Sequence, residues 1–180
     1  TITDAKGCIE TTSATLQNFP PVTAVVDSVI DASCNGSGDG RVYLSVSGGT
    51  APYGYQWGQG LQSSLPDIMP SGTNTMQVLD VNGCTANVNF TINQPLALLA
   101  TATAEDLTCN GSNDGRVLLS VNGGSQPYSF SWSNGPQTVA NNNLPAGNYS
   151  CTITDANGCS ITVSDVVMEP SPIELTLDID

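Results

Sequence analysis

The sequence repeats itself every 75 residues, and no other feature limits its possible folds as strongly. The segment CNGSGDGRVYLSVSGG begins at Cys34 and returns as CNGSNDGRVLLSVNGG at Cys109. The same offset relates Trp57 to Trp132 and needs no insertion. A chain made of two near-copies is expected to fold as a tandem array of equal units.

The two ends of the sequence extend this pattern. TITDAKGC at residues 1–8 matches TITDANGC at 152–159, and the residues after Pro170 resemble the opening of another unit. We therefore expect four parts in a chain cut from a longer array. They are the tail of a preceding repeat (1–21), a first complete repeat (22–95), a second complete repeat (96–170) and the start of a following repeat (171–180).

Each complete repeat has the sequence pattern of short β-strands. Residues 42–46 alternate between apolar and polar side chains, which is the period of a half-buried strand. Glycine pairs at 48–49 and 123–124 mark turns, and no window of 11 residues has the apolar spacing of a helix. About six or seven strands per repeat predict an all-β fold of tandem immunoglobulin-like β-sandwiches, about 75 residues each and braced by disulfides.

Aromatic residues at matched positions are expected to form the core of each sandwich. These structural core residues are Tyr53, Trp57, Tyr128 and Trp132. If its strand faced solvent instead, the row of Tyr53, Tyr55 and Trp57 would offer a stacking platform for sugar rings. Tyr149 is placed to form a tyrosine corner, whereas Asn74 stands at that position in the first repeat, so no corner is expected there.

Six cysteines in a chain rich in glycine and proline indicate disulfides and an oxidising compartment. Two pairings fit the spacing. One closes each repeat on itself, through Cys34–Cys84 and Cys109–Cys159. The other joins neighbouring repeats, through Cys8–Cys34 and Cys84–Cys109. Six strands per repeat would bring its first and last hairpins to the same end, which favours the pairing within each repeat.

Oxygen-bearing side chains alternate in the loop after Cys109. Asn110, Ser112 and Asp114 imitate the first half of a calcium loop, but the twelfth position, which should be a bidentate glutamate, is Val121. We therefore expect a turn closed by local hydrogen bonds and a link from Asp114 to the nearby Arg116. No metal and no other cofactor is expected.

The charge and the missing residue types exclude several function classes. A net charge of −13 with only three basic residues leaves nothing to neutralise a row of phosphates, so nucleic acid is not an expected partner. The chain has no histidine, no apolar run long enough to insert into a membrane and no nucleophile motif. Cys151 occupies the position of Met76 and is expected to be a buried, inert thiol. The sequence therefore predicts no enzyme.

Together, the CNG loop, the GG-x-x-PY-x-[FY]-x-W segment and the DANGC turn resemble the SprB-type repeat of Bacteroidetes surface proteins, named for the gliding-motility adhesin. The resemblance implies a large secreted protein, exported by the type IX route and displayed at the cell surface as a tandem array. The expected function is an extended extracellular stalk in such an adhesin. Its partners would be neighbouring repeats of the same chain, with surface glycan or the surface motility machinery beyond them. Two alternatives remain: a glycan- or protein-binding β-sandwich module, and a filament-forming assembly subunit.

Overall fold

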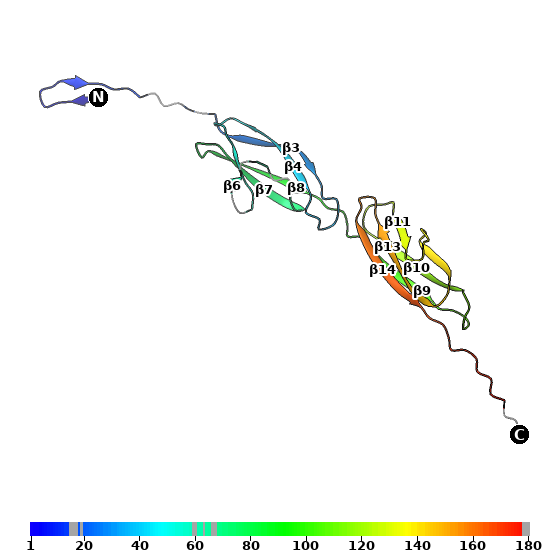
Figure 1. Cartoon of the computed structure of the whole chain (residues 1–180). Helices are drawn as coiled ribbons and strands as arrows, with labels where there is room; N and C mark the ends of the chain where they lie inside the picture. Colours follow the sequence, from blue (N-terminus) through cyan, green and yellow to red (C-terminus); the bar gives the residue numbers. More distant parts are fainter. Residues whose placement is uncertain (15–17, 19, 59–60, 63, 66–67, 178–180) are drawn as a thin grey trace. The chain divides into compact units, whose positions relative to one another are not determined.

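The computed structural model describes residues 1–14, 18, 20–58, 61–62, 64–65 and 68–177 (Figure 1). Within these ranges the backbone forms fourteen β-strands and no helix, so the all-β prediction is confirmed. The chain divides into two compact units. The first unit contains residues 1–28, 43–65 and 75–89. The second contains 29–42, 66–74 and 90–180, and so holds the whole second repeat together with the segments 29–42, 66–74 and 90–95 of the first.

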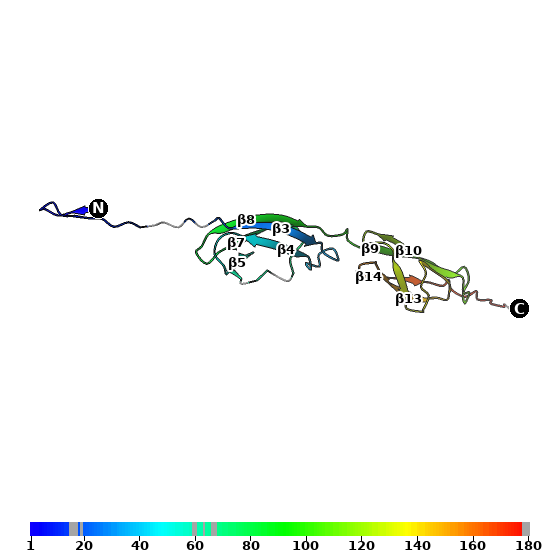
Figure 2. The ribbon, with the colours of Figure 1, turned by 90° about the horizontal axis from the view of Figure 1, so that it is seen from above.

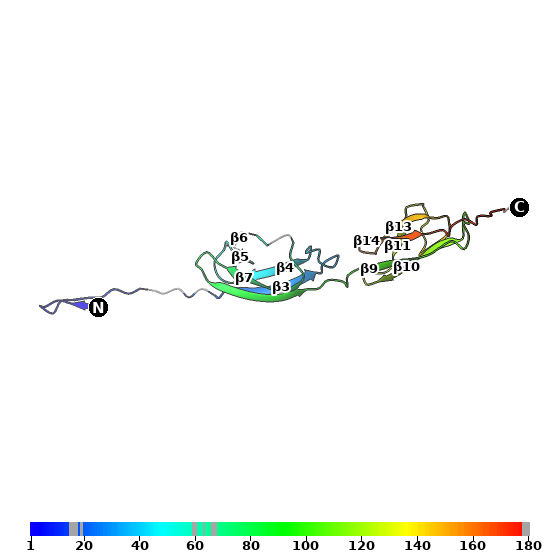
Figure 3. The ribbon, with the colours of Figure 1, turned by 90° about the horizontal axis from the view of Figure 1, so that it is seen from below.

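The second repeat is a sandwich of two three-stranded sheets. One sheet has the order β12-β10-β9 and the other β11-β13-β14. The strands are β9 (Leu99–Glu105), β10 (Gly115–Asn122), β11 (Ser129–Trp132), β12 (Ala140–Leu144), β13 (Gly147–Thr154) and β14 (Ser160–Val167). Figures 2 and 3 show β9 and β10 in one layer and β13 and β14 in the other. Alternating apolar residues along these strands face each other between the layers, which is what the period-two pattern requires.

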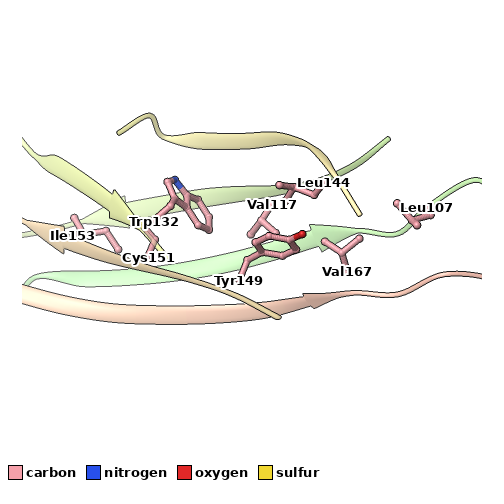
Figure 4. Packing of buried hydrophobic residues seen from close by; sticks show 8 residues of the cluster. All are labelled: Leu107, Val117, Trp132, Leu144, Tyr149, Cys151, Ile153 and Val167. Carbon is pink, nitrogen blue, oxygen red and sulfur yellow. The ribbon is translucent and has the colours of Figure 1, made fainter. Parts of the chain in front are cut away.

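A compact core fills the space between these two sheets (Figure 4). Its buried members are Leu107, Val117, Trp132, Leu144, Tyr149, Cys151, Ile153 and Val167. Trp132 is only 4% exposed, and its indole Nε1 donates a hydrogen bond of 2.8 Å to the carbonyl oxygen of Thr138. The indole therefore fills the core without leaving its one donor unpaired.

Strands β11 and β12 run in the same direction. Strand β11 is antiparallel to β13, which is antiparallel to β14, and β12 is antiparallel to β10, which is antiparallel to β9. Strands β9 and β14 end together, since the Leu107 amide donates to the Met168 carbonyl at 2.9 Å. The chain therefore crosses the sandwich only once through β11 and β12, and it moves from one sheet to the other on the way. The six strands thus make five crossings of the sandwich. The first and last hairpins of the repeat lie at opposite ends.

The first repeat divides its described strands differently between its two sheets. Strands β3 (Thr23–Ile30) and β4 (Arg41–Ser47) form one sheet, and β5 (Gly54–Gln56), β6 (Leu61–Gln62), β7 (Gly72–Leu79) and β8 (Thr85–Ile92) form the other, in the order β6-β5-β7-β8. Met69, Met76 and Val78 are fully buried in this repeat. Before it, β1 (Ile2–Thr3) and β2 (Ile9–Glu10) pair as an antiparallel hairpin.

Both repeats contain a corner bond, although the sequence predicted one only at Tyr149. The Tyr149 hydroxyl donates to the carbonyl oxygen of Pro145 at 2.9 Å. In the first repeat the Asn74 amide Nδ2 donates to the equivalent carbonyl, that of Pro70, at 3.1 Å. The shorter side chain reaches because it lies close to the turn, where it also donates to the carbonyl of Gly72 at 3.0 Å. The first repeat therefore has no tyrosine at this place but keeps a bond to the equivalent carbonyl through Asn74.

We expect Tyr149→Phe to lower the free energy of unfolding of the second repeat by about 1 kcal/mol, because the hydroxyl makes one hydrogen bond in the core and the ring stays in place. Urea denaturation measures this change. The matched control is Tyr43→Phe, since Tyr43 is 46% exposed and its replacement should be neutral. Equal losses from both variants would contradict a specific role for the corner bond.

The glycine pair after β10 brings the backbone close to the start of the repeat. Gly123 has φ of 71°, and a Cβ placed on it would lie 1.9 Å from the carbonyl oxygen of Ala97. Its neighbour Gly124 donates from its amide to the Leu96 carbonyl at 2.9 Å. The pair therefore fixes the segment that leads into β9, and only glycine fits at the first of the two positions.

Candidate functional site

A buried aspartate organises the hairpin between β13 and β14. The carboxylate Oδ1 of Asp155 accepts hydrogen bonds from the amides of Asn157 and Cys159, both at 2.9 Å. Its Oδ2 accepts from the amide of Ser125 at 2.8 Å. One side chain thus closes the turn and ties it to the loop after β10. We call residues 155–159 the NGC hairpin.

Asp80 does the same in the first repeat. Its Oδ1 accepts from the amides of Asn82 and Cys84, at 2.9 and 2.8 Å, and its Oδ2 from the amide of Thr50 at 3.0 Å. Burial by itself would raise the pKa of Asp80, but these amide donors outweigh it and hold the pKa below 3.8. The amides of Ser125, Cys159 and Asn157 likewise hold the pKa of Asp155 below 3.8.

These depressed pKa values predict acid sensitivity. The folded chain binds a proton at Asp155 less readily than the unfolded chain does, so this contribution is complete above the ordinary pKa and is lost as the pH falls below it. We expect the urea midpoint of the second repeat to drop between pH 6 and pH 3. Asp155→Asn should lower the midpoint at pH 6 and reduce its further loss on acidification. An unchanged pH profile in that variant would show that Asp155 is not among the groups responsible.

The loop that contains Cys34 is closed by a second carboxylate. Asp39 accepts from the amide of Ser33 at 3.0 Å, from the Ser33 hydroxyl at 2.5 Å and from the Ser37 hydroxyl. The hydroxyls of Ser33 and Ser37 lower the pKa of Asp39 to about 2. The Asn35 amide Nδ2 donates to the carbonyl of Pro95 at 3.0 Å. We call residues 33–40 the CNG loop, and 108–115 is its counterpart in the second repeat.

The three calcium candidates bond to groups within or beside the loop. The Asn110 amide Nδ2 donates to the Pro170 carbonyl at 3.0 Å, and the Ser112 hydroxyl donates to the Cys109 carbonyl at 2.9 Å. Asp114 accepts from the hydroxyls of Thr108 and Ser112, which lower its pKa. Within the described parts of the chain, no group of three or more acidic or cysteine side chains could hold a metal ion. These contacts assign the three residues to closing the loop.

A disulfide joins the CNG loop to the NGC hairpin of the second repeat. It links Cys34 to Cys159, with a Cα–Cα distance of 5.8 Å and a sequence separation of 125 residues. Cys8, Cys84 and Cys109 are exposed free thiols. Beside the disulfide, the Asn157 amide Nδ2 donates to the Ser33 carbonyl at 2.9 Å.

This pairing differs from both that the sequence suggested. Cys34–Cys84 and Cys109–Cys159 do not form, and neither do Cys8–Cys34 and Cys84–Cys109. The favoured pairing was wrong because it assumed six alternating strands, whereas β11 and β12 make a single pass. Cys109 follows β9 and Cys159 precedes β14, so the two lie at opposite ends of one sandwich and cannot bond.

The remaining candidate residues have structural surroundings. Cys151 is fully buried, and burial raises the pKa of its thiol. Arg116 pairs with Glu105 at 2.5 Å on the surface, and not with Asp114 as the sequence suggested, because Arg116 and Glu105 are directly opposed across β9 and β10.

The four aromatic residues fall into two groups. Trp132 is buried, and Tyr128 packs against the same core. Tyr53 and Trp57 are half-buried in the first repeat. Both tyrosines make the same bond: the Tyr53 hydroxyl donates to the Gly48 carbonyl at 2.6 Å and the Tyr128 hydroxyl to the Gly123 carbonyl at 2.5 Å. They hold the glycine turns in place, a role that their spacing of five residues from the first glycine of each pair could have indicated.

Comparisons with known structures give a weak likeness to immunoglobulin-type chains. One match is from "Structural basis for Dscam isoform specificity", with 13% identity, a TM-score of 0.36, and coverage of 89% of this chain and 45% of that chain. Another is Dscam1 isoform 9.44, N-terminal four Ig domains, with 15% identity, a TM-score of 0.37, and coverage of 86% and 47%. This chain therefore spans less than half the length of either. No curated protein matches the chain.

No helix suited to crossing a membrane occurs in the part of the chain that the structure describes.

A comparison with protein-family models finds one family in two places. The sequence model of the SprB repeat matches residues 26–62 and again residues 101–137, which are 75 residues apart and agree with the internal repeat. Each match begins in the first strand of a sandwich and includes the CNG loop or its counterpart. Two segments of this chain, together less than half of its length, therefore match the SprB repeat.

Proposed function

We propose that this chain is a section of an extended, non-catalytic stalk in a large bacterial cell-surface adhesin of the gliding-motility type. Support comes from the two segments that match the SprB repeat, which occurs in surface proteins without catalytic activity. The all-β fold supports the proposal as well. In this proposal the protein is extracellular and exported by the type IX route. Its nearest partners are the neighbouring repeats of the same chain, and surface glycan or motility machinery lies beyond them.

The observation that carries the proposal is the disulfide between Cys34 and Cys159. The 125-residue separation encloses strands β4 to β13 between the two cysteines. A force applied to the two ends of the chain would pass through the disulfide and bypass the enclosed strands. Only the strands outside the two cysteines, such as β3 and β14, can then be pulled away. Such a bond suits a stalk under tension.

Single-molecule stretching tests this function. When the chain is pulled from its two ends, reduction of the disulfide should add about 410–450 Å of extension, because 125 residues are released at about 3.3–3.6 Å each. The variant Cys34→Ser should show the longer extension without reductant. Equal extension of the oxidised wild type and this variant would contradict the mechanical role.

A second candidate function, glycan binding, is favoured by one observation. A pocket in the first repeat is lined by Tyr53 and Gln62, which offer an aromatic face and an amide. Glycan-array binding by the whole chain tests it. Binding that is lost in Gln62→Ala would support a glycan site, whereas no binding to any polysaccharide by a folded chain would overturn it.

A further inference from the structure

The counterpart of the CNG loop in the second repeat has the same internal bonds as the CNG loop but a free cysteine. Asn110 donates to the Pro170 carbonyl as Asn35 donates to the Pro95 carbonyl, both at 3.0 Å. The amide of Gly111 is bound by a side-chain oxygen of Glu169 at 3.0 Å, as that of Gly36 is by Gln94 at 2.8 Å. Cys109 is therefore held in the same local setting as Cys34, which is bonded.

A pocket lies beside Cys109 where the other loop has its partner. It is lined by Thr108, Cys109, Asn110 and the segment Pro170–Ile173. At the CNG loop, the equivalent surroundings consist of Cys34, Asn35, Ala97 and Leu98, and there Cys159 and Ser160 complete the lining. The pocket beside Cys109 thus has the lining that receives an NGC hairpin, without the hairpin.

A second free cysteine, in the hairpin between β7 and β8 of the first repeat, fits this arrangement. Cys84 occupies in the NGC hairpin of the first repeat the place that Cys159 occupies in the second, and it is an exposed thiol. Asp80 shapes that hairpin with the same amide bonds as Asp155. Asn82 stands where Asn157 donates to the Ser33 carbonyl. Each complete repeat therefore presents one receiving loop and one inserting hairpin.

From these matched sites we infer that Cys109 is a cross-linking site for the NGC hairpin of a following SprB repeat, and that Cys84 is the corresponding site for the CNG loop of a preceding one. In an array every repeat is then joined covalently to the next by a bond of the Cys34–Cys159 kind. The partner of Cys109 is thus a second copy of the NGC hairpin, with its asparagine donating to the carbonyl of Thr108. This inference rests on the proposed function, since it requires a tandem array.

The step is an oxidation of two thiols. The Sγ of Cys109 and the Sγ of the incoming cysteine each lose a proton and one electron as the S–S bond forms. The oxidant is a small-molecule disulfide such as oxidised glutathione, which accepts the two electrons and two protons and leaves as two thiols. Exchange proceeds through a mixed disulfide on the more accessible sulfur. Cys109 is exposed and can be attacked in this way.

The test is a longer chain in which a further copy of residues 96–170 follows Pro170, so that the 75-residue register is kept. After folding with oxidised and reduced glutathione, free thiols are alkylated and the disulfide-linked peptides are mapped. We expect two linked pairs: Cys34 with Cys159, and Cys109 with the added copy's counterpart of Cys159. In the 180-residue chain Cys109 should be alkylated completely.

The control replaces the cysteine in the NGC hairpin of the added copy with alanine. Cys109 should then be alkylated again, while Cys34–Cys159 and the circular dichroism spectrum stay unchanged. Alkylation of Cys109 in the longer chain, or its pairing with Cys84, would overturn the inference. A chain that forms both bonds but gains no extension on reduction would leave the inference in place and contradict the stalk function.

Discussion

Replacing Trp132 with alanine should lower the free energy of unfolding of the second repeat by about 3–5 kcal/mol, the range for deleting a large aromatic side chain from a close-packed core. The indole is 4% exposed and packs among the buried residues between the two sheets. Its loss also leaves the Thr138 carbonyl without the hydrogen bond from Nε1. Hydrogen exchange measured by mass spectrometry along β13 and β14 reports this loss for the second repeat.

The chain supplies its own control for this substitution. Trp57 holds the equivalent place in the first repeat but is only half-buried. Trp57→Ala should therefore cost less than about 2 kcal/mol, because less contact area is lost. Equal destabilisation of the two repeats by the two substitutions would contradict the difference in burial.

Replacing Gly123 with alanine should destabilise the second repeat by at least about 3 kcal/mol, in the upper part of the range for single substitutions. Two costs combine at this position. The backbone has φ of 71°, where a side chain is strained, and the new Cβ would lie 1.9 Å from the Ala97 carbonyl oxygen. The segment that leads into β9 would have to move away, and the Tyr128 hydroxyl would lose the carbonyl of Gly123 as its fixed acceptor.

Gly111→Ala separates these two costs. Gly111 has φ of 74°, close to that of Gly123, but a Cβ placed on it would have no atom within 4 Å. This variant should lose only about 1–2 kcal/mol, the cost of the left-handed backbone alone. Urea denaturation measures both variants. Similar losses for the two would mean that the close approach to Ala97 contributes nothing.

The parts of the fold that depend on local pattern could be predicted from the sequence. Alternation along residues 42–46 predicted β4, and the glycine pairs predicted the turns where positive φ is needed. These features are visible in sequence because each depends on residues a few positions apart.

The disulfide could not be predicted in the same way, because it depends on how many times the chain crosses the sandwich. Strands β11 and β12 run in one direction but lie in different sheets, so together they make a single crossing. The first and last hairpins of the repeat therefore lie at opposite ends of the sandwich. The corner bond of Asn74 was missed for a related reason: its reach to the Pro70 carbonyl depends on the turn geometry and not on side-chain type.

The site itself was partly visible in the sequence. The aspartate, asparagine, glycine and cysteine of the NGC hairpin were recognised as a turn, and the CNG loop as a loop closed by its own side chains. What the sequence did not indicate is that the loop of one copy receives the hairpin of another. The 75-residue offset alone could not reveal it, because Cys34 bonds to a cysteine 125 residues further along, in the other repeat.

Peptide mapping of the oxidised 180-residue chain without reductant shows which cysteines are joined. We expect one linked pair that contains Cys34 and Cys159, with Cys8, Cys84, Cys109 and Cys151 recovered as alkylated thiols after denaturation. Recovery of Cys34 linked to Cys84, or of Cys109 linked to Cys159, would place the bonds within single repeats and contradict a covalent link between successive repeats.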